Sequence, residues 1–227
     1  ILDVAGVGTF RDDVNIPDKI IHLGDTNTAI RFPSADTISA ETGGSEALRI
    51  NSGQKFLIGS TSMRDIGGSA AQSVVQIEGA SQNRSSISLI NNQAAGTPPT
   101  IRFGKTRGTS VGAVDAVTNG DQLGQIRFCG SDGTDLEHTT AMIVGRVNGS
   151  VSSDTIPTDI AFETSATNNS SRSEKLRITS TGDMGLGTSS PMNFFELKNS
   201  TAQKKLVLSK SNSGTADQNG MWLQFNN

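Results

Sequence analysis

Apolar and polar residues alternate along most of this chain, in short runs separated by turn-forming residues. Two such runs are Ala29-Ile-Arg-Phe32 and Gln125-Ile-Arg-Phe128, in which apolar side chains flank a central arginine. Successive side chains of a β-strand point to opposite faces, so a period of two predicts strands. Turn residues recur about every ten residues, which is typical of an all-β chain of short strands. The sequence predicts no long amphipathic helix.

One pattern occurs twice and organises the chain. It reads Ser45-Glu-Ala-Leu-Arg-Ile-Asn-Ser-Gly-Gln-Lys-Phe-Leu-Ile-Gly-Ser-Thr-Ser62, and it returns from Ser173 to Ser190 with one residue inserted in the turn. Each copy predicts a short strand, a polar turn with glycine, a second short strand and a glycine exit. Because the order of predicted strands after each copy is also the same, we interpret 45–104 and 173–227 as two versions of one module.

We therefore predict four segments: an N-terminal β shaft segment at 1–44, a repeat module at 45–104, an intervening β module with long loops at 105–172, and a second, truncated repeat module at 173–227. The chain begins with Ile1 rather than methionine and ends at Asn227 just after a strand-like run, so we expect it to be part of a longer polypeptide. Outside the repeated pattern, strands are expected at 2–4, 14–16, 19–23, 29–32, 37–40, 74–77, 86–90, 101–103, 125–128, 141–147, 159–162, 194–197, 206–208 and 222–225.

Three stretches carry a resemblance to a known family. SEKLRITSTGDMGLGTSSP (173–191) resembles the E-R-M-R-I-D-S-S-G-N-V-G-I-G-T-T-S-P element of phage tail fibres, those of marine phages above all. GDTNTAIRFPSADT (24–37) and DQLGQIRFCGSDGTDLEHTTAMI (121–143) resemble other segments of such fibres. The resemblance spans roughly half of the chain. It implies a trimeric β-structured virion fibre in the phage tail, used for attachment to the bacterial host.

Composition points away from a thick monomeric core. Hydrophobic residues make up 33% of the chain and aromatic residues 4%, whereas 25 residues are glycine. Regular alternation argues against disorder for most of the chain, which leaves many thin apolar layers as the interpretation. A lone pair of strands is marginally stable at best, and its edges are exposed. We therefore expect a parallel homotrimer: an elongated fibre of short-strand modules, of the interwoven β-prism or triple β-helix type.

Charge and hydropathy exclude two classes of partner. The net charge is −3, and no basic stripe is present, which argues against nucleic acid. No apolar run approaches the ~18 residues that a membrane helix needs, so we predict no membrane insertion. Cys129 is the only cysteine, which we interpret as a small buried residue rather than a reactive thiol.

An arginine stands in the middle of five apolar pairs, and its side chain should point away from both neighbours. One interpretation is a solvated outer face whose charges discourage edge-to-edge aggregation. The alternative is a set of inter-chain salt bridges, for example to Glu46 or Glu174, that fix the register between chains. The residues concerned are Arg31, Arg49, Arg102, Arg127 and Arg177.

Signals for catalysis, cofactors and metals are weak. Neither His22 nor His138 has a metal-ligand spacing to a partner. The stretch Asp-Gly-Thr-Asp-Leu-Glu at 132–137 resembles a loose calcium loop, but it lacks the EF-hand order and its Asp-Gly pair favours a turn. No pair of carboxylates is placed beside aromatic sugar platforms. We predict no enzyme activity, no cofactor and no metal.

The leading hypothesis is a structural virion protein, a segment of a trimeric tail fibre that mediates host attachment. Its partners would be further copies of itself, other phage tail proteins and a bacterial surface receptor, either a glycan or an outer-membrane protein. The alternatives are a tailspike glycan depolymerase on a β-helix and the stalk of a bacterial trimeric adhesin. Because loops commonly carry recognition, contact surfaces are expected at 63–72, 91–99, 108–121, 148–157 and 165–172.

Overall fold

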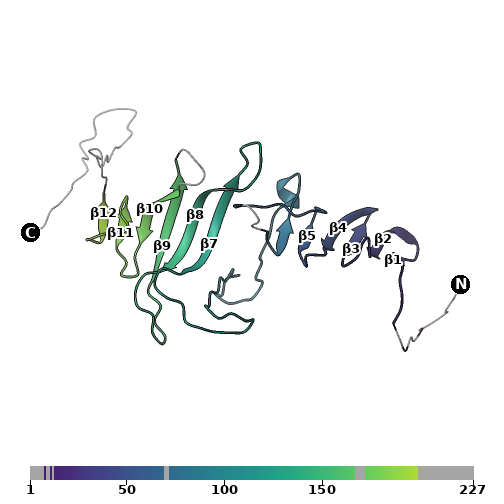
Figure 1. Ribbon diagram of the computed structural model, residues 1–227, viewed down its shortest axis with the longest axis horizontal. Helices are drawn as coiled ribbons and strands as arrows, with labels where there is room; N and C mark the ends of the chain where they lie inside the picture. The colour runs from purple at the N-terminus through teal and green to yellow at the C-terminus, as the bar shows by residue number, and fades with distance from the viewer. Residues whose placement is uncertain (1–7, 9–10, 12, 69–71, 167–171, 199–227) are drawn as a thin grey trace, which may run out of the picture. The chain divides into compact units, whose positions relative to one another are not determined.

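The computed structural model describes residues 8, 11, 13–68, 72–166 and 172–198. Within these residues the chain is all-β, as the alternation predicted, with one short 3-10 helix, η1 (Gln82–Arg84). The strands form two six-stranded sheets in which hydrogen-bonded neighbours follow the order of the chain (Figure 1). No helix in the described part of the chain has the length and hydropathy that crossing a bilayer requires.

The first sheet consists of β1 (Lys19–His22), β2 (Asp25–Arg31), β3 (Ile38–Thr42), β4 (Ser45–Ile50), β5 (Phe56–Ile58) and β6 (Val75–Ile77). Strands β1 to β5 pair in antiparallel fashion, as short polar turns allow. Strand β6 instead pairs parallel to β5 after a long connection.

The register separates the side chains of the first sheet into two unlike faces. One face, called the apolar face below, holds two rows without any charged residue. The rows are Ile20, Ile30, Ala40, Leu48, Ile58 and Ile77, and Ile38, Ile50, Phe56 and Val75. The opposite face carries Arg31 and Arg49 together with the buried residues Ala29, Ser39, Leu57 and Gln76. The arginines thus point away from their apolar neighbours, as predicted.

The second sheet runs in the order β12-β11-β10-β9-β8-β7. Val144, Val147 and Ala161 are its most buried apolar side chains. Cys129, which we predicted to be buried, is half-buried, with its Sγ 3.5 Å from the hydroxyl of Thr139. The strands are β7 (Gln122–Gly130), β8 (His138–Val147), β9 (Thr158–Ser165), β10 (Arg172–Ile178), β11 (Met184–Leu186) and β12 (Phe195–Leu197).

The two copies of the repeated pattern form the same three-strand arrangement. In each copy an antiparallel pair is followed by a parallel third strand, so β4-β5-β6 corresponds to β10-β11-β12. The paired positions also correspond residue by residue: Leu48–Ile58, Arg49–Leu57 and Ile50–Phe56 in the first copy, and Leu176–Leu186, Arg177–Gly185 and Ile178–Met184 in the second.

The glycine at the exit of each pattern is required by the backbone. Gly59 and Gly187 have φ of +77° and +80°, a region that side chains with a Cβ rarely occupy. A Cβ there would also overlap the carbonyl oxygen of Glu78 in the first copy and of Lys198 in the second. These two glycines let the third strand lie close against the second.

Three expected strands are absent. Residues 14–16, 86–90 and 101–103 are not in strands, because no other segment of the described chain pairs with them. The strands expected at 2–4, 206–208 and 222–225 lie outside the described residues. The chain divides into two compact units, Ile1–Gly104 with Ile126–Met142 and Ser165–Arg172, and Lys105–Gln125 with Ile143–Thr164 and Ser173–Asn227. The division into four sequential segments stays a prediction.

Candidate functional site

Among the arginines that stand between apolar residues in the sequence, Arg31, Arg49 and Arg177 bind carboxylates of their own chain. Arg31 Nε lies 3.1 Å from Asp18 Oδ1, and its Nη1 lies 2.8 Å from Glu41 Oε1. Arg49 makes a two-pronged contact with Glu46, with Nε–Oε1 at 2.5 Å and Nη2–Oε2 at 2.7 Å. These hydrogen bonds favour the charged guanidinium and raise the pKa of both arginines above its ordinary value.

Arg177 repeats the contact of Arg49 and extends it into the protein interior. Its Nε and Nη2 lie 2.8 and 2.6 Å from the two carboxylate oxygens of Glu174, which raises the pKa of Arg177. Its Nη1 lies 2.8 Å from Oδ2 of Asp159, a residue with no exposed surface. Asp159 also accepts hydrogen bonds from the Asn148 side chain at 2.6 Å and from the Ser180 backbone N–H at 2.9 Å.

We did not predict this buried carboxylate, because its only signal in the sequence is an acidic residue at the start of a predicted strand. The solvated-face interpretation is wrong for Arg49 and Arg177, whose side chains are only 18% and 11% exposed. Glu46 and Glu174, considered above as partners between chains, are engaged within one chain. An additional role of the arginines in inter-chain register stays a prediction.

The other two arginines are Arg127 and Arg102. Arg127 Nη1 lies 3.4 Å from the carbonyl oxygen of Gly67. Arg102 is exposed and makes no ion pair with any residue that the structure describes. The structure therefore does not bring the five arginines together into one site.

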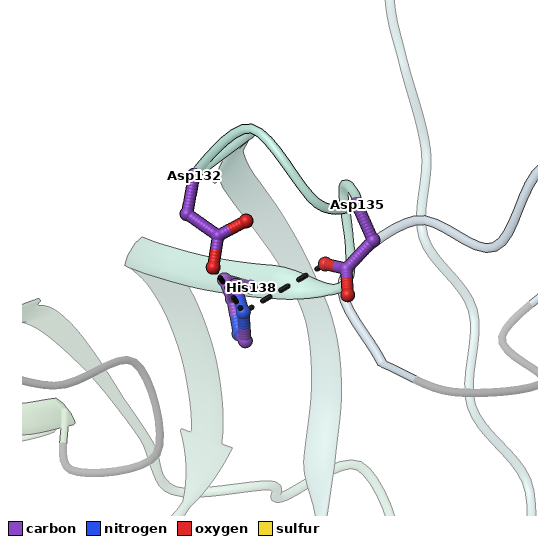
Figure 2. A group of neighbouring side chains, drawn as sticks. All are labelled: Asp132, Asp135 and His138. Carbon is purple, nitrogen blue, oxygen red and sulfur yellow. Dashed lines mark ion pairs between the residues drawn. The ribbon is translucent and has the colours of Figure 1, made fainter.

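A compact group of titratable side chains occupies the loop between β7 and β8. Figure 2 shows Asp132, Asp135 and His138 converging. His138 Nε2 lies 3.3 Å from Asp132 Oδ2 and 3.7 Å from Asp135 Oδ1. The expectation that His138 lacks a neighbouring ligand is wrong, because the turn folds both aspartates back over the start of β8. One ligand atom from each residue lies within 4.8 Å of the others.

The turn that we predicted at 132–137 accounts for this arrangement. Asp132 accepts a hydrogen bond from the Thr134 N–H, and Asp135 accepts one from the Glu137 N–H, both at 2.9 Å. The Thr134 bond, then the Asp135 N–H and the charge of His138, hold the pKa of Asp132 below its ordinary value. The hydrogen bonds of the turn, together with the contacts that both aspartates make to His138 Nε2, account for the close approach of the three side chains without a metal.

Two loops that we predicted as contact surfaces meet in a groove of about 610 Å³. The groove has apolar walls formed by residues such as Val114, Val117 and Ile156, and it contains the carboxylates of Asp115 and Asp154. No aromatic side chain lines it, so it lacks the stacking surface that a sugar-binding cleft commonly offers. The groove can accommodate a ligand or a partner side chain.

An ion pair anchors the first of these loops. Arg107 Nε and Nη2 lie 2.7 and 2.8 Å from the two oxygens of Asp121. This contact, followed by a hydrogen bond from the Thr118 N–H at 2.9 Å, holds the pKa of Asp121 well below its ordinary value. The neighbouring Gly149 N–H donates to Asn119 Oδ1 at 2.9 Å, which ties the second loop to the first.

No protein-family model matches the sequence, and no curated protein is significantly similar to it. In fold, the chain is similar to carboxy-terminal domains of phage tail fibres. Two such structures are of the bacteriophage T5 L-shaped tail fibre. The carboxy-terminal domain has a TM-score of 0.59 and 15% identity over 95% of this chain and 98% of that one. The same domain with its intramolecular chaperone domain has a TM-score of 0.59 and 16% identity over 94% of this chain and 67% of that one. At such identities the likeness establishes a shared fold.

Proposed function

We propose that this chain is a structural segment of a phage tail fibre, which works as a homotrimer and attaches the virion to a bacterial surface. The observation that carries the proposal is the fold, which is shared with a tail fibre domain over 95% of this chain. The sequence resemblance at 173–191, argued independently, supports the same class. Similarity to fibres of marine phages in particular stays a prediction.

The apolar face of the first sheet supports the trimer. Ile20, Ile30, Ile38 and Ile50 are between 43% and 50% exposed in the single chain. The same rows recur in the second sheet, where Leu186 and Phe195 are also exposed. Burial of such side chains is worth about 1.5–3 kcal/mol each, and further copies of the chain would supply it.

Attachment would depend on weak contacts made several times. A trimer presents each loop three times, and linked contacts bind far more tightly than single ones. The groove at 105–117 and 151–156 is a concave surface available to a receptor, for which the alternatives stay a glycan or an outer-membrane protein. Because no aromatic side chain lines it, the groove does not favour the depolymerase alternative.

Immunogold electron microscopy of virions tests the proposal. Antibodies raised against the full chain should label the tails of phage particles that carry it. Label on a bacterial envelope would favour the trimeric adhesin instead, and intact virions without tail label would contradict the proposal. In a second assay, the folded chain added before infection should slow phage adsorption, whereas heat-unfolded chain should not.

A further inference from the structure

The segment between η1 and Gly104 has the sequence of strands but no strand partner. Residues 86–89 and 101–103 alternate in the same way as the paired strands of the first sheet, and Ile90 ends the first run. Their apolar side chains are nevertheless between 48% and 77% exposed, and none of these residues is in a strand. The apolar side chains are those of Ile87, Leu89, Ile90, Ile101 and Phe103.

The backbone of this segment also makes few hydrogen bonds within the chain. Between residues 86 and 104, the only backbone–backbone hydrogen bond among described residues runs from Ala95 N–H to Gln93 O. Backbone amides that are buried in native structures are almost always paired, and formation of a strand would pair these exposed ones. The loop at 91–97 has its own side-chain bonds, from Asn91 to Thr97 and from Thr97 to Gln93. The loop is therefore formed, while the two runs on either side of it lack partners.

The apolar face of the first sheet, in the same compact unit, has the complementary deficiency. Its rows lack a covering layer, and a shallow concavity of about 750 Å³ opens beside Phe32, Ile38 and Ile50. Paired sheets normally bury such a face against another layer. One chain thus contains an uncovered face and two unpaired runs.

We propose that residues 86–90 and 101–103 become strands by pairing with a second copy of this chain, and that they cover the apolar face of that copy. This inference rests on the proposed homotrimer and names the surface by which it assembles.

The absence of charge on both surfaces favours a second copy of the chain as the partner that covers the apolar face. Copies of one chain carry the same net charge, here −3, and like charges placed directly opposite one another are destabilising, so an uncharged surface favours self-association. The apolar face contains no charged residue, and the two runs contain only Arg102. In a strand, Arg102 would point away from Ile101 and Phe103, and so away from the apolar contact. The unpaired runs and the strands of the first sheet both alternate with a period of two. Each run can therefore turn one apolar side toward the apolar face of another copy.

Hydrogen–deuterium exchange on the full chain, with sedimentation velocity under the same conditions, tests the inference. In the trimer, amides of 86–90 and 101–103 should exchange on the order of 100-fold more slowly than those of the loop at 92–97. A trimer in which the two runs exchange as fast as that loop would overturn this inference and leave the proposed function standing. A monomer would overturn both.

A matched pair of variants gives a second readout. Leu89→Asp introduces a charge on the apolar side of the first run and should raise the trimer dissociation constant at least about tenfold. Ser88→Asp introduces the same charge on the opposite side and should leave assembly unchanged. Slow exchange of β3 and β4 in each variant shows that the first sheet is folded. Equal assembly of the two variants would overturn the inference.

Discussion

At the residue scale, one charged residue of the described chain has no exposed surface, and its surroundings explain why that charge is tolerated. Asp159 has no exposed surface and receives hydrogen bonds from a guanidinium, an amide and a backbone N–H. A buried carboxylate is stable only when it is paired and hydrogen-bonded in this way. Arg177 is therefore a different kind of residue from Arg49, although the two occupy equivalent positions in the repeated pattern.

This difference predicts unequal effects of the same substitution. Arg177→Ala should lower the free energy of unfolding by about 3 kcal/mol, because Asp159 would stay buried without its cation. Arg49→Ala should cost about 1 kcal/mol, because Glu46 can still reach water. Urea unfolding at one fixed protein concentration measures both.

Equal losses for the two variants would contradict this account of Asp159. The same variants also address the inter-chain role of the arginines. Repeating the measurement at several protein concentrations separates the two roles, since only an inter-chain contact changes the dissociation constant of the trimer.

The ion pair between Arg107 and Asp121 predicts a pH dependence. The folded-state pKa of Asp121 lies below its ordinary value of 3.8, so its stabilising contribution is complete above that pH and is lost as the pH falls further. Between about pH 4 and pH 2, the melting temperature of the unmodified chain should therefore fall more steeply than that of Asp121→Asn. Asp132, whose pKa is also lowered, contributes equally to both proteins. Parallel profiles would contradict the role given to Asp121.

At the scale of elements, the strands and turns of the repeated pattern were predictable because each residue type in it favours one local conformation. Alternation of Leu48, Arg49 and Ile50 predicted a strand with two unlike faces. Positive φ was expected of glycine in the turn, but in the first copy Gln54 and the exit residue Gly59 adopt it. The same logic failed at 86–90, because alternation indicates only that a segment can be a strand. Whether it becomes one depends on a partner, which is a property of the assembly.

The glycine exit gives a prediction at this scale. Gly59→Ala should destabilise the first sheet by about 2–4 kcal/mol, because a Cβ at φ of +77° would overlap the carbonyl oxygen of Glu78. Gly53→Ala, in the turn of the same pattern, is the matched control, since its Cβ would meet nothing closer than Asn51 Oδ1 at 3.4 Å. Urea unfolding of both variants measures the difference. Similar losses would show that the exit glycine is not required.

The loop at 131–137 shows what sequence analysis of a site can and cannot supply. The Asp-Gly pair correctly predicted a turn, and Thr134 and Glu137 donate the backbone bonds that define it. The convergence of Asp132, Asp135 and His138 was not predictable, because it depends on how β8 begins after the turn. Spacing in sequence fixes the reach of side chains, but the path of the backbone decides which of them meet.

At the scale of the whole molecule, the two sheets each present exposed apolar rows and a low share of core residues. The composition predicted this shortage, since only 33% of residues are hydrophobic. It could not predict which face is left uncovered, because the register of β1 to β6 decides that. Arg31 and Arg49, on the face opposite the apolar face, are partly buried in ion pairs, which reverses the simple expectation that charge faces solvent.

In the proposed fibre, further copies of the chain cover these apolar rows. Sedimentation velocity with mass determination on the full chain tests it most directly. We expect a trimer of three times the chain mass of 23.7 kDa, with a frictional ratio well above that of a compact sphere. A stable, folded monomer would contradict it, because the apolar face would then be stable in water without a partner.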